Sequence, residues 1–118
     1  MIHDEICTYE VCKLAQEKGF NVPTDFCYEH NGCLVRCGSI AAPTQSLLQR
    51  WLREQKGIHI SIDYQQGVDE DCPSYDYSVY RWPINTDAFV SEEWKDGYST
   101  YELALEDALK YALDNLVI

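Results

Sequence analysis

The sequence predicts one compact α+β domain in which helices cover an antiparallel sheet. Apolar residues recur at helical spacing in three segments and at strand spacing in others, in the order α-β-β-α-β-β-(β)-α. The 118 residues match the usual size of one domain, and no long linker rich in Gly, Ser or Pro divides them. We therefore assign residues 1–118 to a single domain.

The first helix is predicted from Asp4 to Lys18, and Gly19 supplies its C-terminal stop. Its apolar face consists of Cys7, Val11, Leu14 and Ala15. Cys12 stands five residues after Cys7, about 140° around a helix, so the two cysteines are not expected to share a face.

A short β-hairpin is predicted next, with residues 26–30 and 33–37 as its strands. Asn31 and Gly32 between them are typical of a two-residue type I′ turn, because both residues tolerate a positive φ. That turn predicts three facing pairs: His30 with Cys33, Tyr28 with Val35 and Phe26 with Cys37.

The second helix is predicted to begin near Pro43 or Thr44 and to end at Gly57. Its apolar stripe consists of Leu47, Leu48, Trp51 and Leu52. A half-buried strand follows at 58–64, because Ile58, Ile60 and Ile62 alternate there with polar residues.

A second long strand is predicted at 75–82, antiparallel to the strand at 58–64. The acidic run at 69–71 between them lacks the spacing of a calcium loop and is interpreted as a solvated loop. Residues 88–90 form either a short third strand or a loop packed around Trp94. The last helix is predicted from a capping box of Ser99 and Glu102.

The predicted core combines the apolar faces of these elements. It consists of Leu47, Leu48, Trp51, Ile58, Ile60, Ile62, Val79, Leu105 and Leu109.

Three stretches carry a resemblance to known proteins: residues 9–20, residues 42–54 with the Pro-Thr-Gln start and Trp-Leu-Arg-Glu end of a helix, and residues 98–109. Together they resemble a family of small acidic proteins of unknown function, encoded by gut-bacterial phages and by prophage-like mobile elements. The resemblance implies this genomic context and a shared α+β fold. It carries over no activity, ligand or catalytic residue, and the cysteines, Cys12 among them, depart from the pattern.

The net charge of −11 is concentrated in the second half of the chain, where residues 57–118 hold 13 acidic and 3 basic residues. Such a field disfavours direct binding of nucleic acid or anionic lipid and favours a basic protein partner. The sequence shows neither an export signal nor 18 consecutive apolar residues, so we expect a soluble cytoplasmic protein with reduced cysteines and no membrane contact.

Aromatic residues in the second half of the chain exceed what one face of a small sheet buries. The candidate binding surface consists of Tyr80, Trp82, Glu92, Glu93, Trp94 and Asp96. The competing interpretation places these aromatic rings in a core beneath the last helix.

A metal site is the alternative, since Cys27, His30, Cys33 and Cys37 offer the ligands of a tetrahedral zinc site. The predicted hairpin argues against it, because Cys27 lies on the opposite ribbon face and four residues separate Cys33 from Cys37, about 13 Å along a strand. No Cys/His pair stands in a recognisable catalytic motif.

We therefore expect a non-enzymatic accessory protein of a phage or mobile element, without cofactor, that binds a basic protein partner through an acidic and aromatic surface. Carboxylates that imitate DNA phosphates are one form of this hypothesis. The alternative is a small metal-binding or cysteine-dependent protein that uses residues 27–37.

Overall fold

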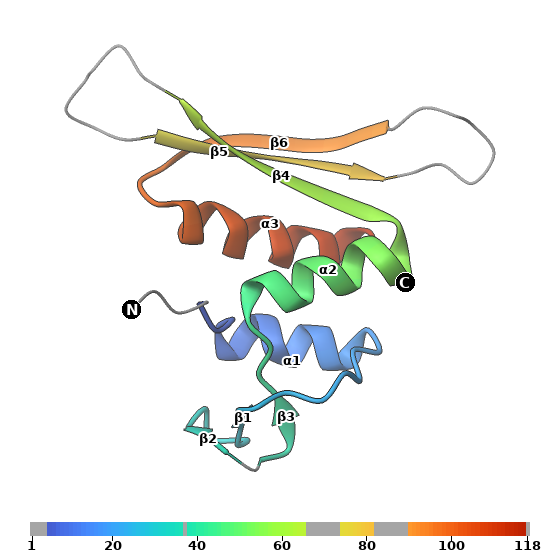
Figure 1. The fold of residues 1–118 in the computed structure, drawn as a ribbon, viewed down its shortest axis with the longest axis vertical. Helices are drawn as coiled ribbons and strands as arrows, with labels where there is room; N and C mark the ends of the chain where they lie inside the picture. The colour runs from blue at the N-terminus through green and yellow to red at the C-terminus, as the bar shows by residue number, and fades with distance from the viewer. Residues whose placement is uncertain (1–4, 37, 66–73, 82–89, 118) are drawn as a thin grey trace.

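Layers of secondary structure follow one another along the long axis of the molecule (Figure 1). The computed structural model describes residues 5–36, 38–65, 74–81 and 90–117, and of residues 65 and 90–93 it describes the backbone. A three-stranded sheet is followed by two helices, then by a third helix and a second, smaller sheet. The predicted α+β class and approximate element order are confirmed, but the strands form two antiparallel sheets instead of one.

Each helix begins directly after a threonine. The helices are α1 (Tyr9–Glu17), α2 (Gln45–Lys56) and α3 (Tyr101–Asn115). The hydroxyls of Thr8, Thr44 and Thr100 accept hydrogen bonds from backbone N–H groups three residues later, at 3.4, 3.2 and 3.1 Å. These bonds satisfy donors that have no partner within the helix.

Two predicted helix starts were wrong for the same reason. Thr8 caps α1, so the helix begins at Tyr9, and Ile6 instead forms a β-bridge with Thr44. Thr100, not Ser99, caps α3, which places Glu102 at the second helical position, where it cannot complete the expected capping box.

The main sheet has the order β4-β5-β6. Its strands are β4 (Ile58–Gln65), β5 (Ser74–Arg81) and β6 (Val90–Tyr98). The third strand is therefore real and longer than a segment at 88–90. Two irregularities in the pairing of β5 with β6 explain why its alternation is not recognisable in the sequence.

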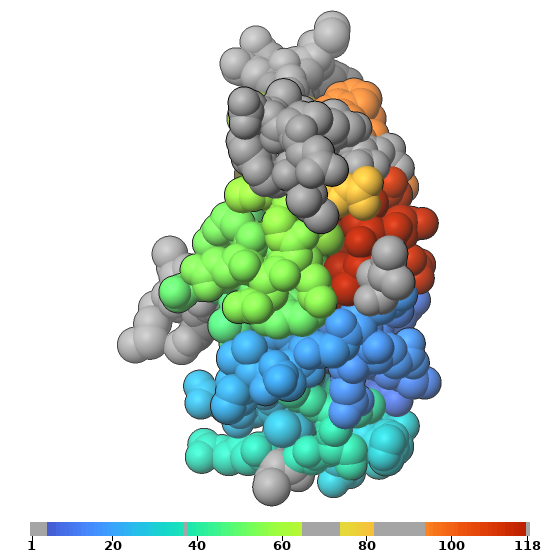
Figure 2. Space-filling model, turned by 90° about the vertical axis from the view of Figure 1, so that its right-hand side faces the viewer, coloured from blue at the N-terminus to red at the C-terminus, as the bar shows by residue number. Residues whose placement is uncertain are grey.

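Both α2 and α3 pack on one face of the main sheet (Figure 1). They also pack against each other, and α1 packs against α3. Figure 2 shows this arrangement from the side, with α2 in green beside α3 in red and α1 in blue below them. None of the helices among the described residues is both long enough and apolar enough to cross a membrane.

The small sheet has the order β2-β1-β3. Its strands are β1 (Cys27–Tyr28), β2 (Leu34–Val35) and β3 (Ile40–Ala41), and β3 was not predicted. The predicted hairpin between β1 and β2 exists, but its register was wrong by one residue: Cys27 pairs with Val35 and Tyr28 with Leu34.

A three-residue turn causes this shift. The N–H of Gly32 donates to the carbonyl of Glu29 at 2.9 Å, and the Asn31 side chain accepts from the N–H of Cys33 at 2.9 Å. Gly32 has φ of +88°, whereas no other residue type among the described ones has a positive φ. A type I′ turn needs a positive φ at both central residues, so Asn31 excludes it.

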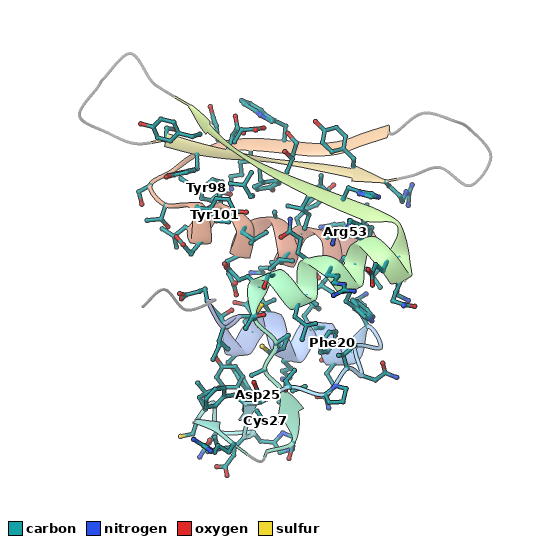
Figure 3. All side chains as sticks on the ribbon, viewed as in Figure 1. Phe20, Asp25, Cys27, Arg53, Tyr98 and Tyr101 are labelled. Atoms are coloured by element: carbon teal, nitrogen blue, oxygen red, sulfur yellow. The ribbon has the colours of Figure 1, made fainter. Side chains whose placement is uncertain are left out.

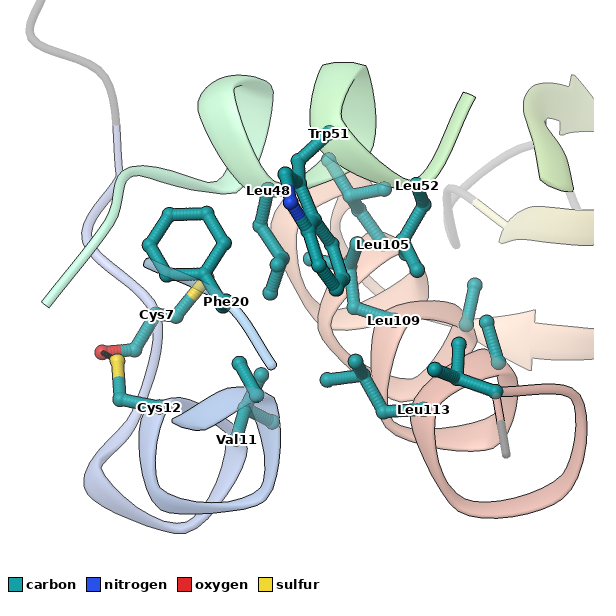
Figure 4. Packing of buried hydrophobic residues seen from close by; sticks show 14 of the residues in the cluster. Cys7, Val11, Cys12, Phe20, Leu48, Trp51, Leu52, Leu105, Leu109 and Leu113 are labelled. Atoms are coloured by element: carbon teal, nitrogen blue, oxygen red, sulfur yellow. Dashed lines mark hydrogen bonds between the residues drawn. The ribbon is translucent and has the colours of Figure 1, made fainter. Parts of the chain in front are cut away.

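The core lies between the main sheet, α2, α3 and α1 (Figure 4). Six of the predicted core residues are buried: Leu48, Trp51, Ile58, Val79, Leu105 and Leu109. Leu47, Ile60 and Ile62 are half-buried and pack against this cluster. The ring of Phe20 meets the Trp51 ring edge-on, at 5.4 Å between centroids.

Candidate functional site

The main sheet has one face that no described helix covers, which we call the outer face (Figure 1). Alternation along β4 and β5 directs Ile58, Tyr77 and Val79 into the core. The residues between them therefore point to the opposite side. The outer face consists of His59, Ser61, Asp63, Asp76, Ser78, Tyr80 and Trp94.

Three rows cross the outer face from strand to strand. The first pairs His59 with Tyr80 and Tyr80 with Ser91, and the second pairs Ser61 with Ser78 and Ser78 with Trp94. In the third row Asp63 pairs with Asp76, which lies opposite a bulge in β6. The bulge consists of Asp96 and Gly97, because Tyr75 pairs with Tyr98 and Tyr77 with Lys95.

Two of the predicted aromatic site residues lie on this face. Trp94 is 55% exposed and lies opposite Ser78, diagonally from the half-buried Tyr80. Trp94 is therefore not part of a core beneath α3, because α3 packs on the other face of the sheet. Trp82 lies outside the described residues.

Of the three predicted acidic site residues, only Asp96 has a side chain that the structure describes. Asp96 is exposed at the bulge beside Asp76. The backbone of Glu93 pairs with Val79, and Glu92 lies at the second irregularity of the β5–β6 pairing. The side chains of Glu92 and Glu93 lie outside the described part of the chain.

Sequence reasoning missed two carboxylates of the outer face. Asp63 is exposed, whereas Asp76 is only 2% exposed although no described helix lies over it. Both acids alternate with apolar or aromatic residues, in two strands that the sequence predicts as antiparallel. The observed register brings the two carboxylates together, but alternation within each strand does not determine which residue of one strand faces which residue of the other.

The segment of the alternative metal site has a different geometry from the predicted one. With the observed register, Cys27 and Cys33 lie on the same ribbon face, two residues apart across the strands. His30 lies in the turn, and its carbonyl accepts a hydrogen bond from the Tyr9 hydroxyl at 3.1 Å. Among the described residues no group of three or more His, Cys, Asp or Glu side chains is placed to hold a metal ion, and Cys37 lies outside them.

Cys7, just before α1, and Cys12, within α1, are buried together. Cys12 Sγ donates to the Cys7 carbonyl at 3.5 Å, and the Tyr28 hydroxyl donates to the same carbonyl at 2.9 Å. The prediction that the two cysteines point apart was wrong, because Cys7 precedes the helix and packs on its first turns as a hydrophobic staple.

The thiol of Cys7 has low nucleophilic reactivity. Its hydrogen bond with Cys12 and its burial both raise the pKa of the Cys7 thiol far above the ordinary value. Burial also raises the pKa of the nearby Tyr28 hydroxyl. Since the thiolate is the reactive form of cysteine, Cys7 is a poor nucleophile at neutral pH.

A polar network joins the three helices beneath the sheet. The carboxylate of Glu106 on α3 accepts from the backbone N–H of Thr8 at 2.7 Å and from the side-chain amide of Gln45 at 2.8 Å. Gln45 is 4% exposed and also donates to the carbonyl of Glu102 at 2.9 Å. Glu106 thus lies at the N-terminal ends of α1 and α2, where a negative charge is favourable.

Several cavities flank the helices in the described part of the chain. One of about 480 Å³ lies at the start of α2 and is lined by Ile6, Thr24, Phe26 and Leu47 among others. Another of about 330 Å³ lies between α1 and α3 and is lined by Tyr98, Asp107 and Lys110 among others. In the second, the Tyr98 hydroxyl donates to the Asp107 carboxylate, which also lies 3.6 Å from the Lys95 ammonium.

Comparison of the chain with protein-family models, with curated proteins and with solved structures gives no match.

Proposed function

We propose that the chain is a non-enzymatic accessory protein of a phage or mobile element that binds a basic protein partner in the cytoplasm. The outer face of the main sheet is the binding surface. The observation that carries the proposal is the exposed Trp94 ring, which lies in the row next to the carboxylates of Asp63 and Asp76. The predicted site residue Tyr80 lies on the same face, and the predicted site residue Asp96 is exposed at the bulge beside Asp76.

The chemistry of this surface suits arginine. A guanidinium stacks on aromatic rings and pairs with carboxylates in two parallel hydrogen bonds, so one arginine can engage Trp94 and an aspartate together. The exposed Asp63 and Asp96 leave their carboxylates accessible to a partner. The net charge of −11 attracts a basic protein over a longer range and raises its association rate.

The position of the aromatic rings on the sheet also suits a protein partner. Trp94 and Tyr80 lie on adjacent strands of a sheet, and neither lines the cavities described beside the helices. Aromatic residues at the centre of a contact area carry a large share of binding energy in protein interfaces. Trp94 is therefore the residue expected to dominate this interface.

The experiment is photocrosslinking in lysate of a host bacterium, followed by binding measurements with the purified partner. A crosslinking amino acid is placed at position 94 or, as the matched control, at position 103 on α3, because Trp94 and Leu103 are 55% and 54% exposed. We expect a basic protein to be crosslinked from position 94 and not from position 103.

Variants then test the chemistry of the interface with that partner. Trp94→Ala is expected to weaken binding at least tenfold, as for an interface hot spot, and Asp63→Asn by a smaller factor that shrinks in high salt. Leu103→Ala should leave the affinity unchanged. Equal crosslinking from both positions, or equal affinity of all variants, would rule out the outer face as the binding surface.

A further inference from the structure

The cavity of about 480 Å³ at the start of α2 is built by three segments of the chain. The segment that leads into α2 is bonded to both of the others. The N–H of Ala42 donates to the Phe26 carbonyl at 3.0 Å, and the N–H of Cys7 donates to the Pro43 carbonyl at 3.0 Å. These backbone bonds hold the walls in place, and the volume lies within the usual range of small-molecule sites.

The lining of the cavity is mainly apolar. Phe26 is 38% exposed, and Ile6 and Leu47 are half-buried, so apolar surface is left in contact with solvent at this place. Covering such surface with an apolar ligand is favourable, by about 25 cal/mol for each Å² that is removed from water. The cavity therefore favours a ligand with an apolar body.

The polar side chains of the cavity differ in their capacity to bind a ligand. The Thr24 hydroxyl donates to the Phe26 carbonyl at 2.6 Å. The Thr44 hydroxyl accepts from the N–H of Leu47 at 3.2 Å. Asp25 is exposed, and with the other described residues it forms neither a hydrogen bond nor an ion pair. Among the described residues that line the cavity, Asp25 alone is charged, so its carboxylate is the group that would select a ligand.

The charges around the cavity favour a cation over an anion. An ammonium group pairs with a carboxylate in a charge-assisted hydrogen bond, and the net charge of −11 raises the local concentration of cations. The start of a helix can bind anions through its free N–H groups. At the start of α2, however, the N–H of Gln45 already donates to the Glu5 carbonyl at 2.7 Å. A divalent metal ion needs more oxygen ligands than one carboxylate supplies.

We propose that this cavity binds a small organic amine, in which an apolar body is joined to an ammonium group. The apolar body packs against Phe26, Ile6 and Leu47, and the ammonium group pairs with the Asp25 carboxylate. Figure 3 shows Asp25 at the end of the molecule that holds the small sheet, away from the main sheet. None of the described residues of the outer face lines the cavity, so this site goes beyond the proposed function and does not depend on it.

The test is an NMR titration of the isotope-labelled full chain with phenethylamine, with phenylacetate and phenethyl alcohol as anionic and neutral analogues of similar size. We expect the amine to shift the amides of residues 24–26 and 44–47 and to bind more tightly than either analogue. Asp25→Asn should weaken binding of the amine about tenfold and leave binding of the alcohol unchanged. Asp63→Asn is the matched control, because it removes the same charge from an exposed position on the outer face and should leave amine binding unchanged.

Further comparisons test the apolar contact and the source of the ammonium group. Phe26→Ala should weaken binding of the amine and of the alcohol alike. The proposal is overturned if millimolar amine causes no shift changes around the cavity, or if phenylacetate binds as tightly. Equal effects of Asp25→Asn and Asp63→Asn on amine binding also overturn it. Nα-acetyl-lysine methylamide is the last probe, since binding as tight as that of phenethylamine would assign the site to a lysine of a protein and not to a small amine.

Discussion

The two faces of the main sheet differ in how their side chains are buried. On the inner face, Val79 is fully buried and packs in the same cluster as Leu109 of α3. On the outer face, Trp94 is more than half exposed and lies among carboxylates. The inner face holds the fold together, whereas the outer face leaves the Trp94 ring and the Asp63 carboxylate exposed, although Asp76 is buried.

The largest expected effect is a difference in the free energy of unfolding between a variant of the inner face and a variant of the outer face. Leu109→Ala removes a fully buried side chain and should lower the free energy of unfolding by about 2–5 kcal/mol. Trp94→Ala should change it by less than about 1 kcal/mol, although it removes a larger side chain, because that ring is mostly in solvent already. Urea unfolding followed by circular dichroism measures both. Comparable losses would mean that Trp94 is a core residue and not a binding residue.

A smaller effect is expected at the polar network that fixes the helices under the inner face. Glu106→Ala removes a charged acceptor from two hydrogen bonds. In the same urea experiment it should lower the free energy of unfolding by about 2–3 kcal/mol. Glu102→Ala is the control, since Gln45 contacts the backbone carbonyl of Glu102 and not its carboxylate. If the two variants lose equal stability, Glu106 acts only through its charge in the first turns of α3.

The smallest effect concerns reactivity instead of stability. Cys33 is exposed, whereas Cys7 and Cys12 are buried and the pKa of the Cys7 thiol is strongly raised. At pH 8 we expect iodoacetamide to modify Cys33 before Cys7 and Cys12, and to reach Cys7 only through unfolding, as followed by peptide mass spectrometry. Adding urea should then accelerate modification of Cys7 far more than that of Cys33. Fast modification of Cys7 in the native protein would contradict the burial of this pair.

Helices could be predicted from the sequence, including the start of α2 at its cap Thr44, but the starts of α1 and α3 could not. Apolar stripes located α2 and α3 well, because their periodicity extends over several turns. The start of α1 was placed too early, since Cys7 has helical spacing to Val11 yet lies before the cap Thr8. Spacing alone does not distinguish a residue of the first turn from one that packs on it from outside.

The sheets were less accessible to sequence reasoning. β6 was only partly recognised, because two irregularities in its pairing break the alternation that marks a strand. The hairpin register depended on whether Asn31 takes a positive φ, which the Asn-Gly pair favours but does not require. The row of Asp63 and Asp76 depends on the pairing of two strands, so no single segment of sequence displays it.

The candidate surface was predicted in part by composition. Trp94, Tyr80 and Asp96 were chosen because aromatic and acidic residues are dense in this half of the chain. Composition did not show which face of the sheet they occupy, because that depends on where the helices pack. The helices take the face of Ile58 and Val79, and this leaves Trp94 outside.

The central claim is that the outer face binds basic segments of a protein. The most direct measurement is an NMR titration of the isotope-labelled chain with an arginine-rich peptide. We expect amide shift changes to centre on Asp63, Asp76 and Trp94, to spare α1, and to weaken strongly in the Trp94→Ala variant. Changes spread evenly over the acidic residues, or changes that are unaffected by Trp94→Ala, would contradict the claim and would reduce the attraction to net charge alone.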